Sequence, residues 1–185
     1  MVNKEMLYED EHRSVRAAED ASQCIITCKD DTAAVYDRIS NYLKDRLSNE
    51  AGVPADFIKT LSEGEYVRKT AGTPEEVCLR AGADGLEPTD KNVPEALADL
   101  AVQAGTWLKK FFLGIGLELT EVRLTFGKDA DGVMVLTGAI SPETCLFRDA
   151  TTKDEPDPDT FRREVGSLAD AYREMLSRVS GTQEA

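Results

Sequence analysis

The chain has 185 residues and a mass of 20.3 kDa, a size that suits one domain or two small domains sharing a cleft. Hydrophobic residues make up 41%, enough for a packed core, and no run approaches the roughly 18–20 apolar residues needed to cross a bilayer. With 22 basic and 35 acidic residues the net charge is −13, which argues against nucleic acid or an anionic membrane as the main partner, because both repel a polyanion.

The N-terminal residues, the single histidine and the few cysteines indicate the cellular location and exclude some kinds of catalytic and metal site. The charged stretch at positions 1–13 lacks an apolar signal core, so we expect a cytoplasmic protein. The single histidine, His12, excludes His-rich metal sites and would have to serve any Ser–His or Cys–His catalysis. Cys24 and Cys28 are expected on one face of a strand as small core residues, while a redox or metal role for the pair is the less favoured alternative.

Short strands dominate the first eighty residues. They are predicted at 7–10, 12–17, 23–28, 57–61, 65–69 and 76–80. A cluster of turn-forming residues at 29–32 follows the first three strands, and a second cluster at 70–76 indicates a hinge. We therefore divide the chain into a β-rich N-terminal lobe, 1–72, and a second lobe, 73–185.

One helix is predicted inside the N-terminal lobe, from about Tyr36 to Glu50. Ile39, Leu43 and Leu47 recur four residues apart and form a single apolar stripe. Gly52 is the expected C-terminal stop, because glycine adopts the left-handed conformation that ends many helices.

The second lobe begins with a predicted loop at 81–93, which is rich in small and polar residues. A helix is expected to start at 92–94 and to run to about Leu113, with Trp107 beside its apolar face. That face comprises Leu97, Leu100, Ala101, Ala104, Leu108, Phe111 and Phe112.

A β-hairpin is predicted after this helix, with strands at 117–126 and 133–140. The alternation changes phase near Thr120–Glu121, which indicates a bulge. Asp129 and Asp131 in the connecting loop are interpreted as a solvated hairpin tip, because the further acids of a calcium loop are missing. Beyond an acidic linker at 149–159, Asp159 is predicted to cap a last helix over about 160–179.

Eight segments, in their order along nearly the whole chain, resemble the SAICAR synthetase family. They are LY at 7–8, KDDTAA at 29–34, AGVP at 51–54, SEGEYVRK at 62–69, TPEEVCLRAGADG at 73–85, WLKKFFLGIGLELTEVRLTFG at 107–127, ISPETC at 140–145 and DPDTFRREVGSLADAYREML at 157–176. The resemblance implies an α+β, two-lobed fold with a small β-rich N-terminal lobe, an ATP-grasp-like C-terminal lobe and ATP in the cleft between them. It also implies an enzyme that uses ATP and Mg²⁺ to join aspartate to the carboxylate of an aminoimidazole ribonucleotide.

The same resemblance implies two sets of site residues. The predicted cofactor-binding residues are Arg13, Arg68, Lys69 and Glu76. The predicted substrate-binding residues are Arg80, Ser141, Glu143 and Arg162. For Arg80, a salt bridge at a strand edge is an equally weighted alternative.

The departures from the family pattern concern charge. Asp10 and Glu11 stand where the resemblance implies a glycine and a lysine against phosphate, and a like-charge pair at about 4 Å costs a few kcal/mol. Its metal-binding acids are replaced by Thr125, Gly138 and Ala139, and its substrate arginine by Leu146. The chain is also several dozen residues short, with missing blocks after residue 34 and around 85–93.

Two functional hypotheses follow. The favoured one is a degenerate synthetase, a pseudoenzyme that has lost ATP- and Mg²⁺-dependent ligation and serves as a binding, regulatory or accessory protein. The alternative is an active ATP-dependent amide ligase whose metal is held by other acids, such as Glu118, Glu121 and Glu143. Possible partners are a nucleotide-like small molecule and a protein, including a second copy bound near 81–93.

Overall fold

A computed structural model describes residues 6–83, 85–141, 144–152, 163 and 165. Two antiparallel sheets and two long helices make an α+β fold. Across the first sheet the strands are ordered β1 (Met6–Glu9), β2 (Arg13–Ala17), β3 (Gln23–Cys28), β5 (Glu65–Lys69) and β4 (Phe57–Ser62). Across the second they are β10 (Cys145–Asp149), β8 (Leu117–Lys128), β6 (Glu75–Gly82) and β7 (Gly85–Pro88), with β9 (Met134–Leu136) paired to the end of β8.

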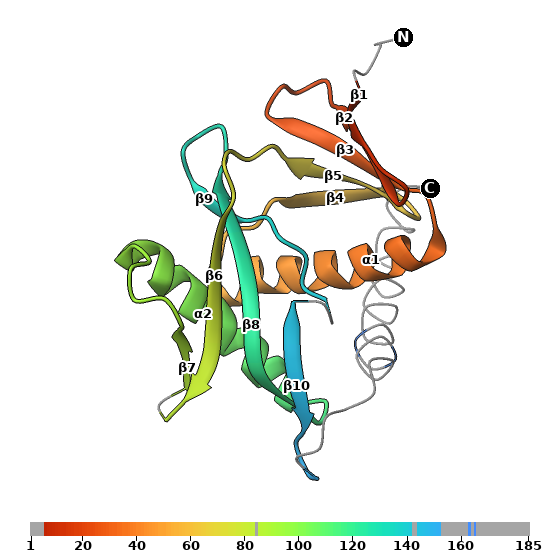
Figure 1. Ribbon diagram of the computed structural model, residues 1–185. Coiled ribbons are helices and arrows are strands. Elements are labelled where there is room, and N and C mark those ends of the chain that lie inside the picture. The colour runs from red at the N-terminus through yellow and green to blue at the C-terminus, as the bar shows by residue number, and fades with distance from the viewer. Residues whose placement is uncertain (1–5, 84, 142–143, 153–162, 164, 166–185) are drawn as a thin grey trace.

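The two helices take different places relative to the sheets. Helix α1 (Asp31–Arg46) runs beneath the first sheet and across the strands of the second (Figure 1). Helix α2 (Glu95–Leu113) covers one face of the second sheet, against β6, β7 and β8. The chain passes from the first sheet to the second over residues 70–74, at the predicted hinge. The division of the chain into two lobes at 72/73 remains a prediction.

Helix α1 begins earlier than predicted, because the residues expected to form a turn cap it. The Asp30 side chain accepts a hydrogen bond from the Ala33 N–H at 2.7 Å and satisfies one donor of the first turn. The apolar stripe is confirmed, since Ile39, Leu43 and Leu47 are fully buried. A short π-helix, η1 (Leu47–Ala51), follows, and Gly52 ends it with φ of 68°, as the sequence predicts.

The strands of the second sheet depart from the sequence prediction in three places. Residues 81–93 are not all loop: β7 pairs antiparallel with β6 and buries Leu86. The return strand ends at Leu136, after which 137–141 leave the sheet and pass beside α1. Strand β10 was not predicted, because a five-residue run with one buried side chain gives little signal.

The bulge and the second long helix are confirmed. In the β8–β10 ladder Glu121 faces Leu146 and Leu119 faces Phe147, so Thr120 is the extra residue. Helix α2 begins within one residue of its predicted start, behind Pro94, and ends at Leu113 as predicted. The predicted helix over about 160–179 lies outside the described residues.

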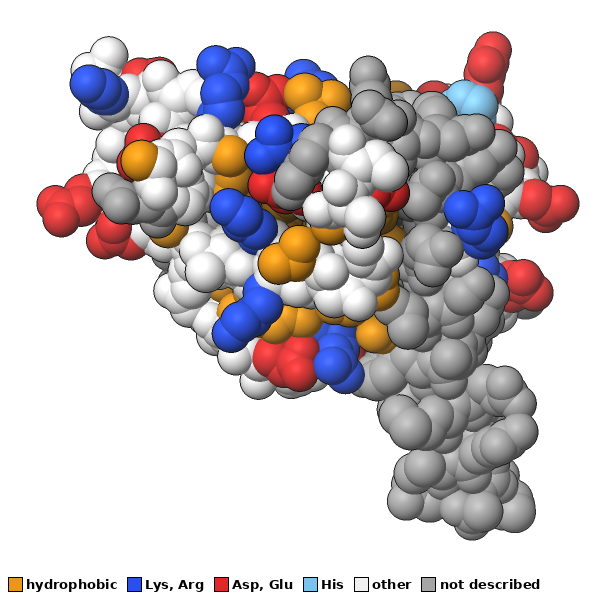
Figure 2. Space-filling model, turned by 90° about the horizontal axis from the view of Figure 1, so that it is seen from below, with side chains coloured by type: hydrophobic (Ala, Val, Ile, Leu, Met, Phe, Trp, Pro, Cys, Tyr) orange, Lys and Arg blue, Asp and Glu red, His pale blue; other side chains and the backbone are white. Residues whose placement is uncertain are grey.

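A single core joins α1 to the second sheet. Its buried apolar side chains come from α1, α2, β6, β7, β8 and β9, while a smaller cluster of Val15, Cys24 and Ile26 lies within the first sheet. Neither long helix in the described ranges is apolar enough to span a membrane. On the face shown in Figure 2, basic and acidic side chains are interspersed and hydrophobic ones form small separate patches.

Candidate functional site

A cavity of about 710 Å³ opens between the first sheet, α1 and the segment 137–141. This cavity, called the cleft cavity below, is large enough for a small-molecule ligand. Its lining residues are His12, Arg13, Asp30, Thr32, Ala33, Tyr36, Asp37, Ser40, Asn41, Lys44, Tyr66, Arg68, Thr137, Ala139 and Ser141.

The floor of the cleft cavity is a polar face of α1. Asp37, Ser40, Asn41 and Lys44 are three or four residues apart, so they lie along one side of the helix, and all four are buried. Burying a polar side chain is costly unless it has hydrogen-bond partners. The partners of this face therefore show how the cavity is built.

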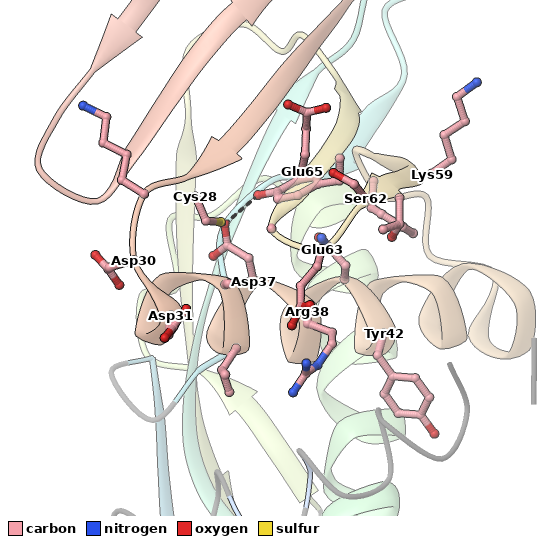
Figure 3. Close-up of a pocket in the computed structure, with 18 of the residues that line it drawn as sticks. Cys28, Asp30, Asp31, Asp37, Arg38, Tyr42, Lys59, Ser62, Glu63 and Glu65 are labelled. Carbon is pink, nitrogen blue, oxygen red and sulfur yellow. Dashed lines mark hydrogen bonds between the residues drawn. The ribbon is translucent and has the colours of Figure 1, made fainter. Parts of the chain in front are cut away.

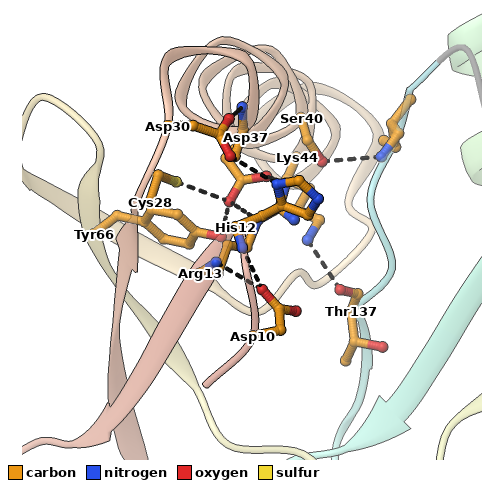
Figure 4. A network of polar contacts seen from close by, with 12 residues as sticks. Asp10, His12, Arg13, Cys28, Asp30, Asp37, Ser40, Lys44, Tyr66 and Thr137 are labelled. Atoms are coloured by element: carbon orange, nitrogen blue, oxygen red, sulfur yellow. Dashed lines mark hydrogen bonds and ion pairs between the residues drawn. The ribbon is translucent and has the colours of Figure 1, made fainter. Parts of the chain in front are cut away.

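Asp37 is the centre of one hydrogen-bond network (Figure 4). The Arg13 guanidinium donates to both of its carboxylate oxygens, from Nε at 2.8 Å and from Nη2 at 2.7 Å. The Tyr66 hydroxyl donates to Oδ2 at 2.9 Å, and the Cys28 thiol donates to the same oxygen at 3.4 Å. Asp37 thus joins α1 to three strands of the first sheet.

The network shifts the pKa values of its members. Burial, and then the negative charge of Asp37, raise the pKa of the Cys28 thiol to about 12, so the thiolate is disfavoured. The same two causes raise the pKa of Tyr66. Cys28 therefore acts as a hydrogen-bond donor in a reduced state, and all four cysteines are free.

A second buried contact lies about two helical turns further along α1. Lys44 Nζ donates to Asp56 Oδ1 at 2.9 Å and to the Thr137 carbonyl at 3.2 Å. Both side chains of the ion pair are almost completely buried, at 6% and 3% exposure. The Asp56 backbone bonds to Leu136 and Lys69, so this ion pair lies where α1, β5 and β9 meet.

The segment 137–141 is held against α1 at two points. The Thr137 carbonyl accepts from Lys44, and the Ile140 N–H donates to Ser40 Oγ at 3.0 Å. Ser40 and Lys44 are one turn apart, which matches the spacing of these two contacts. Ser141 follows directly and lines the cavity.

Asp10, one of the two acids predicted to repel phosphate, has a structural role next to His12 and Arg13 of the cavity lining. Asp10 Oδ1 accepts from the N–H groups of His12 and Arg13, which lowers the Asp10 pKa. His12 Nδ1 lies 2.7 Å from Asp30 Oδ2, and this hydrogen bond raises the pKa of His12. Asp10 therefore shapes the β1–β2 turn.

Of the eight predicted site residues, three meet in the cleft cavity: Arg13, Arg68 and Ser141. Within the described part of the chain no carboxylate forms an ion pair with Arg68. Burial alone would lower its pKa, but a hydrogen bond to Cys24 and the charge of Asp56 outweigh that effect and raise it.

The other predicted residues lie elsewhere. Lys69 Nζ is 3.4 Å from Asp129 Oδ2, and that carboxylate also accepts from the backbone of its own hairpin tip. Glu76 and Arg80 are exposed on β6, outside the lining of the cleft cavity. Arg80 donates twice to Glu121 on β8, at 3.0 and 2.8 Å, so the predicted salt bridge is present, between two inner strands of the sheet rather than at its edge. Glu143 and Arg162 lie outside the described residues.

Sequence reasoning missed Ser40, Asn41 and Lys44. The 3–4 spacing of the polar residues at 37, 40, 41 and 44 was visible, but a polar helical stripe usually faces solvent. Only the packing of the segment 137–141 against α1 places these side chains inside.

The residues described here do not fit the divalent metal that the resemblance implies. Thr125 and Gly138 do lie side by side, because a Cβ at Gly138 would meet the Thr125 Cβ at 2.7 Å, but neither has a carboxylate. Of the alternative acids, Glu118 pairs with Arg148 and Glu121 with Arg80. No group of three His, Cys, Asp or Glu side chains suited to a metal occurs in the described ranges.

A second cavity, of about 610 Å³, lies on another side of α1, beneath the β4–β5 hairpin (Figure 3). Its acidic residues outnumber its basic ones. The acids are Asp30, Asp31, Asp37, Asp45, Glu63 and Glu65, and the bases are Lys29, Arg38 and Lys59. Ala34, where the resemblance places one missing block, lines this cavity.

Comparison with known proteins gives matches along the whole chain. The family model for SAICAR synthetase matches residues 85–179. The phosphoribosylaminoimidazole-succinocarboxamide synthase of Deinococcus deserti is 32% identical over 235 aligned positions, covering 97% of this chain and 99% of the relative. That of a Clostridium botulinum strain is 30% identical, covering 97% and 100%. Since the Deinococcus alignment has 235 positions and this chain 185 residues, at least 50 positions face gaps here.

Solved structures share the fold. The phosphoribosylaminoimidazole-succinocarboxamide synthase of Ehrlichia chaffeensis matches with a TM-score of 0.66 and 23% identity, covering 95% of this chain and 98% of that one. A SAICAR synthetase in complex with ADP matches with a TM-score of 0.64 and 24% identity, covering 96% and 98%.

These matches contradict the favoured hypothesis of the sequence analysis. Relatives that align with almost the whole chain are named as the synthase itself, and nothing in the comparisons indicates a loss of activity. The prediction of a pseudoenzyme is therefore wrong. It gave too much weight to substitutions at single positions and too little to similarity along the full length.

Proposed function

This chain belongs to the SAICAR synthetase family, and from that premise we propose that it is an active ATP-dependent ligase that joins an amino acid to a carboxylate through an amide bond. The observation that carries the proposal is the alignment with the Deinococcus relative, which covers 97% of this chain and 99% of that enzyme. A carboxylate and an amine do not condense readily in neutral water, so ATP is the expected source of activation. A related structure holds ADP, which supports a nucleotide as ligand.

The cleft cavity is the proposed site of ligand binding. Arg13, Arg68 and Ser141 line it, and they combine guanidinium and hydroxyl donors suited to phosphate and carboxylate oxygens. Lys69 and Glu76 are proposed to contact the nucleotide from the hinge, and Arg80, Glu143 and Arg162 to contact the substrate. The ATP-grasp-like character of the second lobe, the cytoplasmic location and a protein partner remain predictions.

The described residues contribute positioning and charge. The bidentate bond from Arg13 to Asp37 fixes the guanidinium at the cavity wall, and burial of this wall strengthens its electrostatic field. Because the chain carries a net charge of −13, cations held inside this cleft are the expected attraction for an anionic ligand.

The test is a ligation assay with ATP, Mg²⁺, aspartate and the carboxylated aminoimidazole ribonucleotide. We expect ADP, inorganic phosphate and a product whose mass equals the two substrates joined with loss of water, the oxygen lost from the carboxylate leaving in the phosphate. ADP formation must require both substrates. Arg13→Gln should lower kcat/KM, whereas Arg16→Gln, on the exposed side of the same strand, is the matched control. No product, or ATP turnover independent of both substrates, overturns the proposal.

A further inference from the structure

Lys44 has a donor that the described residues leave unused. An ammonium group carries three N–H donors, and two of them are directed to Asp56 and the Thr137 carbonyl. Among the described residues no acceptor takes the third. The Lys44 side chain is 6% exposed and lines the cleft cavity, the space where a ligand would lie.

Lys44 lies beside the positions where the resemblance implies metal-binding carboxylates. Its Nζ contacts the carbonyl of Thr137, the residue directly before Gly138, and Gly138 N donates to the Thr125 carbonyl at 3.2 Å. Positions 125 and 138 are those where the resemblance implies metal carboxylates. This chain therefore places a fixed ammonium beside a site that has lost its anionic ligands, and such a charge disfavours a divalent cation close by.

Arg68 supplies a second cation in the same cavity. Asp56 forms the ion pair with Lys44, and its charge also acts on Arg68. The Asp56 carboxylate thus faces two cations, Lys44 and Arg68, whereas Arg13 has its own partner in Asp37. This leaves one positive charge in excess beside Lys44 and Arg68. A phosphate group carries about two negative charges and several acceptor oxygens. It can therefore bind the Lys44 ammonium and the planar Arg68 guanidinium at the same time.

We propose that Lys44 binds a phosphate group in the cleft cavity, with Arg68 as the second cation, and that this subsite holds the phosphate without a divalent metal. The inference rests on the proposed function for the presence of phosphorylated ligands. Either the nucleotide or the phosphorylated imidazole substrate carries such a group.

The test measures binding by isothermal titration calorimetry in EDTA, with ADP and ribose 5-phosphate as probes. Lys44→Met should weaken binding at least about tenfold, because the charge is removed. Asp56→Asn should leave binding unchanged or strengthen it, because it removes the neutralising carboxylate. Lys59→Met, an exposed lysine outside this cavity, should have no effect. Loss of ADP binding assigns the subsite to the nucleotide, and loss of ribose 5-phosphate binding assigns it to the substrate.

A purely structural role for the ion pair gives a different result. Lys44→Met and Asp56→Asn would then both lower the unfolding temperature, and neither would change the affinity of the folded protein. Should Lys44→Met not fold, Lys44→Met/Asp56→Leu removes both buried charges and should fold but not bind.

Three results overturn the inference. They are wild-type affinity in folded Lys44→Met or Lys44→Met/Asp56→Leu, no binding of either probe to the wild type, and binding to the wild type only when Mg²⁺ is present. The ligation assay is read separately. If the wild type ligates and Lys44→Met binds the probes as well as the wild type does, this subsite alone is refuted. If binding depends on Lys44 but the wild type does not ligate, the proposed function alone is refuted.

Discussion

Helices α1 and α2 are both long and both pack on the second sheet, but they bury different kinds of side chain. The buried residues of α2 are apolar or small, namely Leu97, Ala101, Ala104, Gly105, Leu108 and Phe112. Helix α1 buries an apolar stripe and, beside it, four polar residues that line the cleft cavity. One helix therefore serves the core alone, while the other serves the core and the candidate site.

The difference shows how a small protein places polar groups inside. Three of the four buried polar side chains of α1 gain partners from other elements: Arg13 for Asp37, Asp56 for Lys44 and Ile140 for Ser40. Each partner removes part of the cost of burial. The stability of α1 should thus depend on hydrogen bonds as well as on packing, and that of α2 on packing alone.

The largest expected effect is at the centre of the α1 network. Asp37→Ala leaves Arg13 without its ion pair and Tyr66 without its acceptor, so we expect a loss of about 3 kcal/mol in the free energy of unfolding. Urea denaturation measures it. Asp99→Ala, an exposed acid on α2, is the control and should change stability by less than about 0.5 kcal/mol. Equal effects would show that the α1 network adds nothing to stability.

A smaller effect is expected where α2 packs most closely. A Cβ at Gly105 would lie 2.5 Å from Leu79 Cδ1 and 3.1 Å from Leu86 Cδ1. Gly105→Ala should destabilise the protein by about 1–2 kcal/mol, because overpacking outweighs the better helix propensity of alanine. Thermal unfolding checks this. An increase in stability would mean that Leu79 on β6 and Leu86 on β7 can move away from α2 at little cost in free energy.

On the sheet face opposite Leu79, the ion pair of Arg80 and Glu121 should contribute less. The Arg80 side chain is 68% exposed, and exposed pairs contribute about 0–1 kcal/mol. Arg80→Gln should therefore change the free energy of unfolding by less than about 1 kcal/mol, and less still in high salt. If this variant instead lowers ligation with stability intact, its predicted role in substrate binding is supported.

The smallest effect concerns the N-terminal cap of α1. The pKa of His12 is raised above 6.5 by its hydrogen bond to Asp30, so the stability from the charged imidazole is complete below 6.5 and is lost as pH rises through the raised value. The pKa of Asp30 is lowered below 3.8, by the Ala33 N–H first and then by His12, so its contribution is lost only as pH falls through that lowered value.

Unfolding temperatures of wild type and His12→Gln, compared at about pH 5.5 and pH 8.5, check this prediction. The wild type should lose more stability than the variant between these two values. Equal loss would mean that the imidazole at the α1 cap does not stabilise the folded state.

Local pattern was enough for most elements of the fold. The meander, the β4–β5 hairpin, the β8 bulge and the apolar faces of both helices follow from side-chain periodicity and from residues such as Gly52 and Pro94. Strands β7 and β10 were missed, because each is too short to show a clear periodicity. Their strand conformation depends on pairing, of β7 with the adjacent β6 and of β10 with β8. The start of α1 was placed too late, because the residues at 29–32 were assigned to a turn. Asp30 instead caps the helix, which begins at Asp31.

The candidate site was predicted only in part, for the same reason. Arg13, Arg68 and Ser141 were identified by resemblance to a family and meet in one cavity, whereas Glu76 and Arg80 lie on a different surface. The functional hypothesis rested on the substitutions at Asp10, Glu11, Thr125, Gly138, Ala139 and Leu146 taken together, and the matches along the whole chain contradict it. One of its assumptions was that Asp10 faces a ligand. Asp10 instead binds backbone N–H groups of its own turn.

What the amino-acid sequence determined by itself is the family, the order of the elements and the side of each helix that enters the core, since these depend on periodicity and on motifs read along the chain. What only the tertiary structure decided is which charges meet. A side chain such as Lys44 becomes a buried cation in a cavity only when Asp56 and Thr137 come to it from two other parts of the chain, because electrostatic and hydrogen-bond energies depend on distance in space and on exclusion of water.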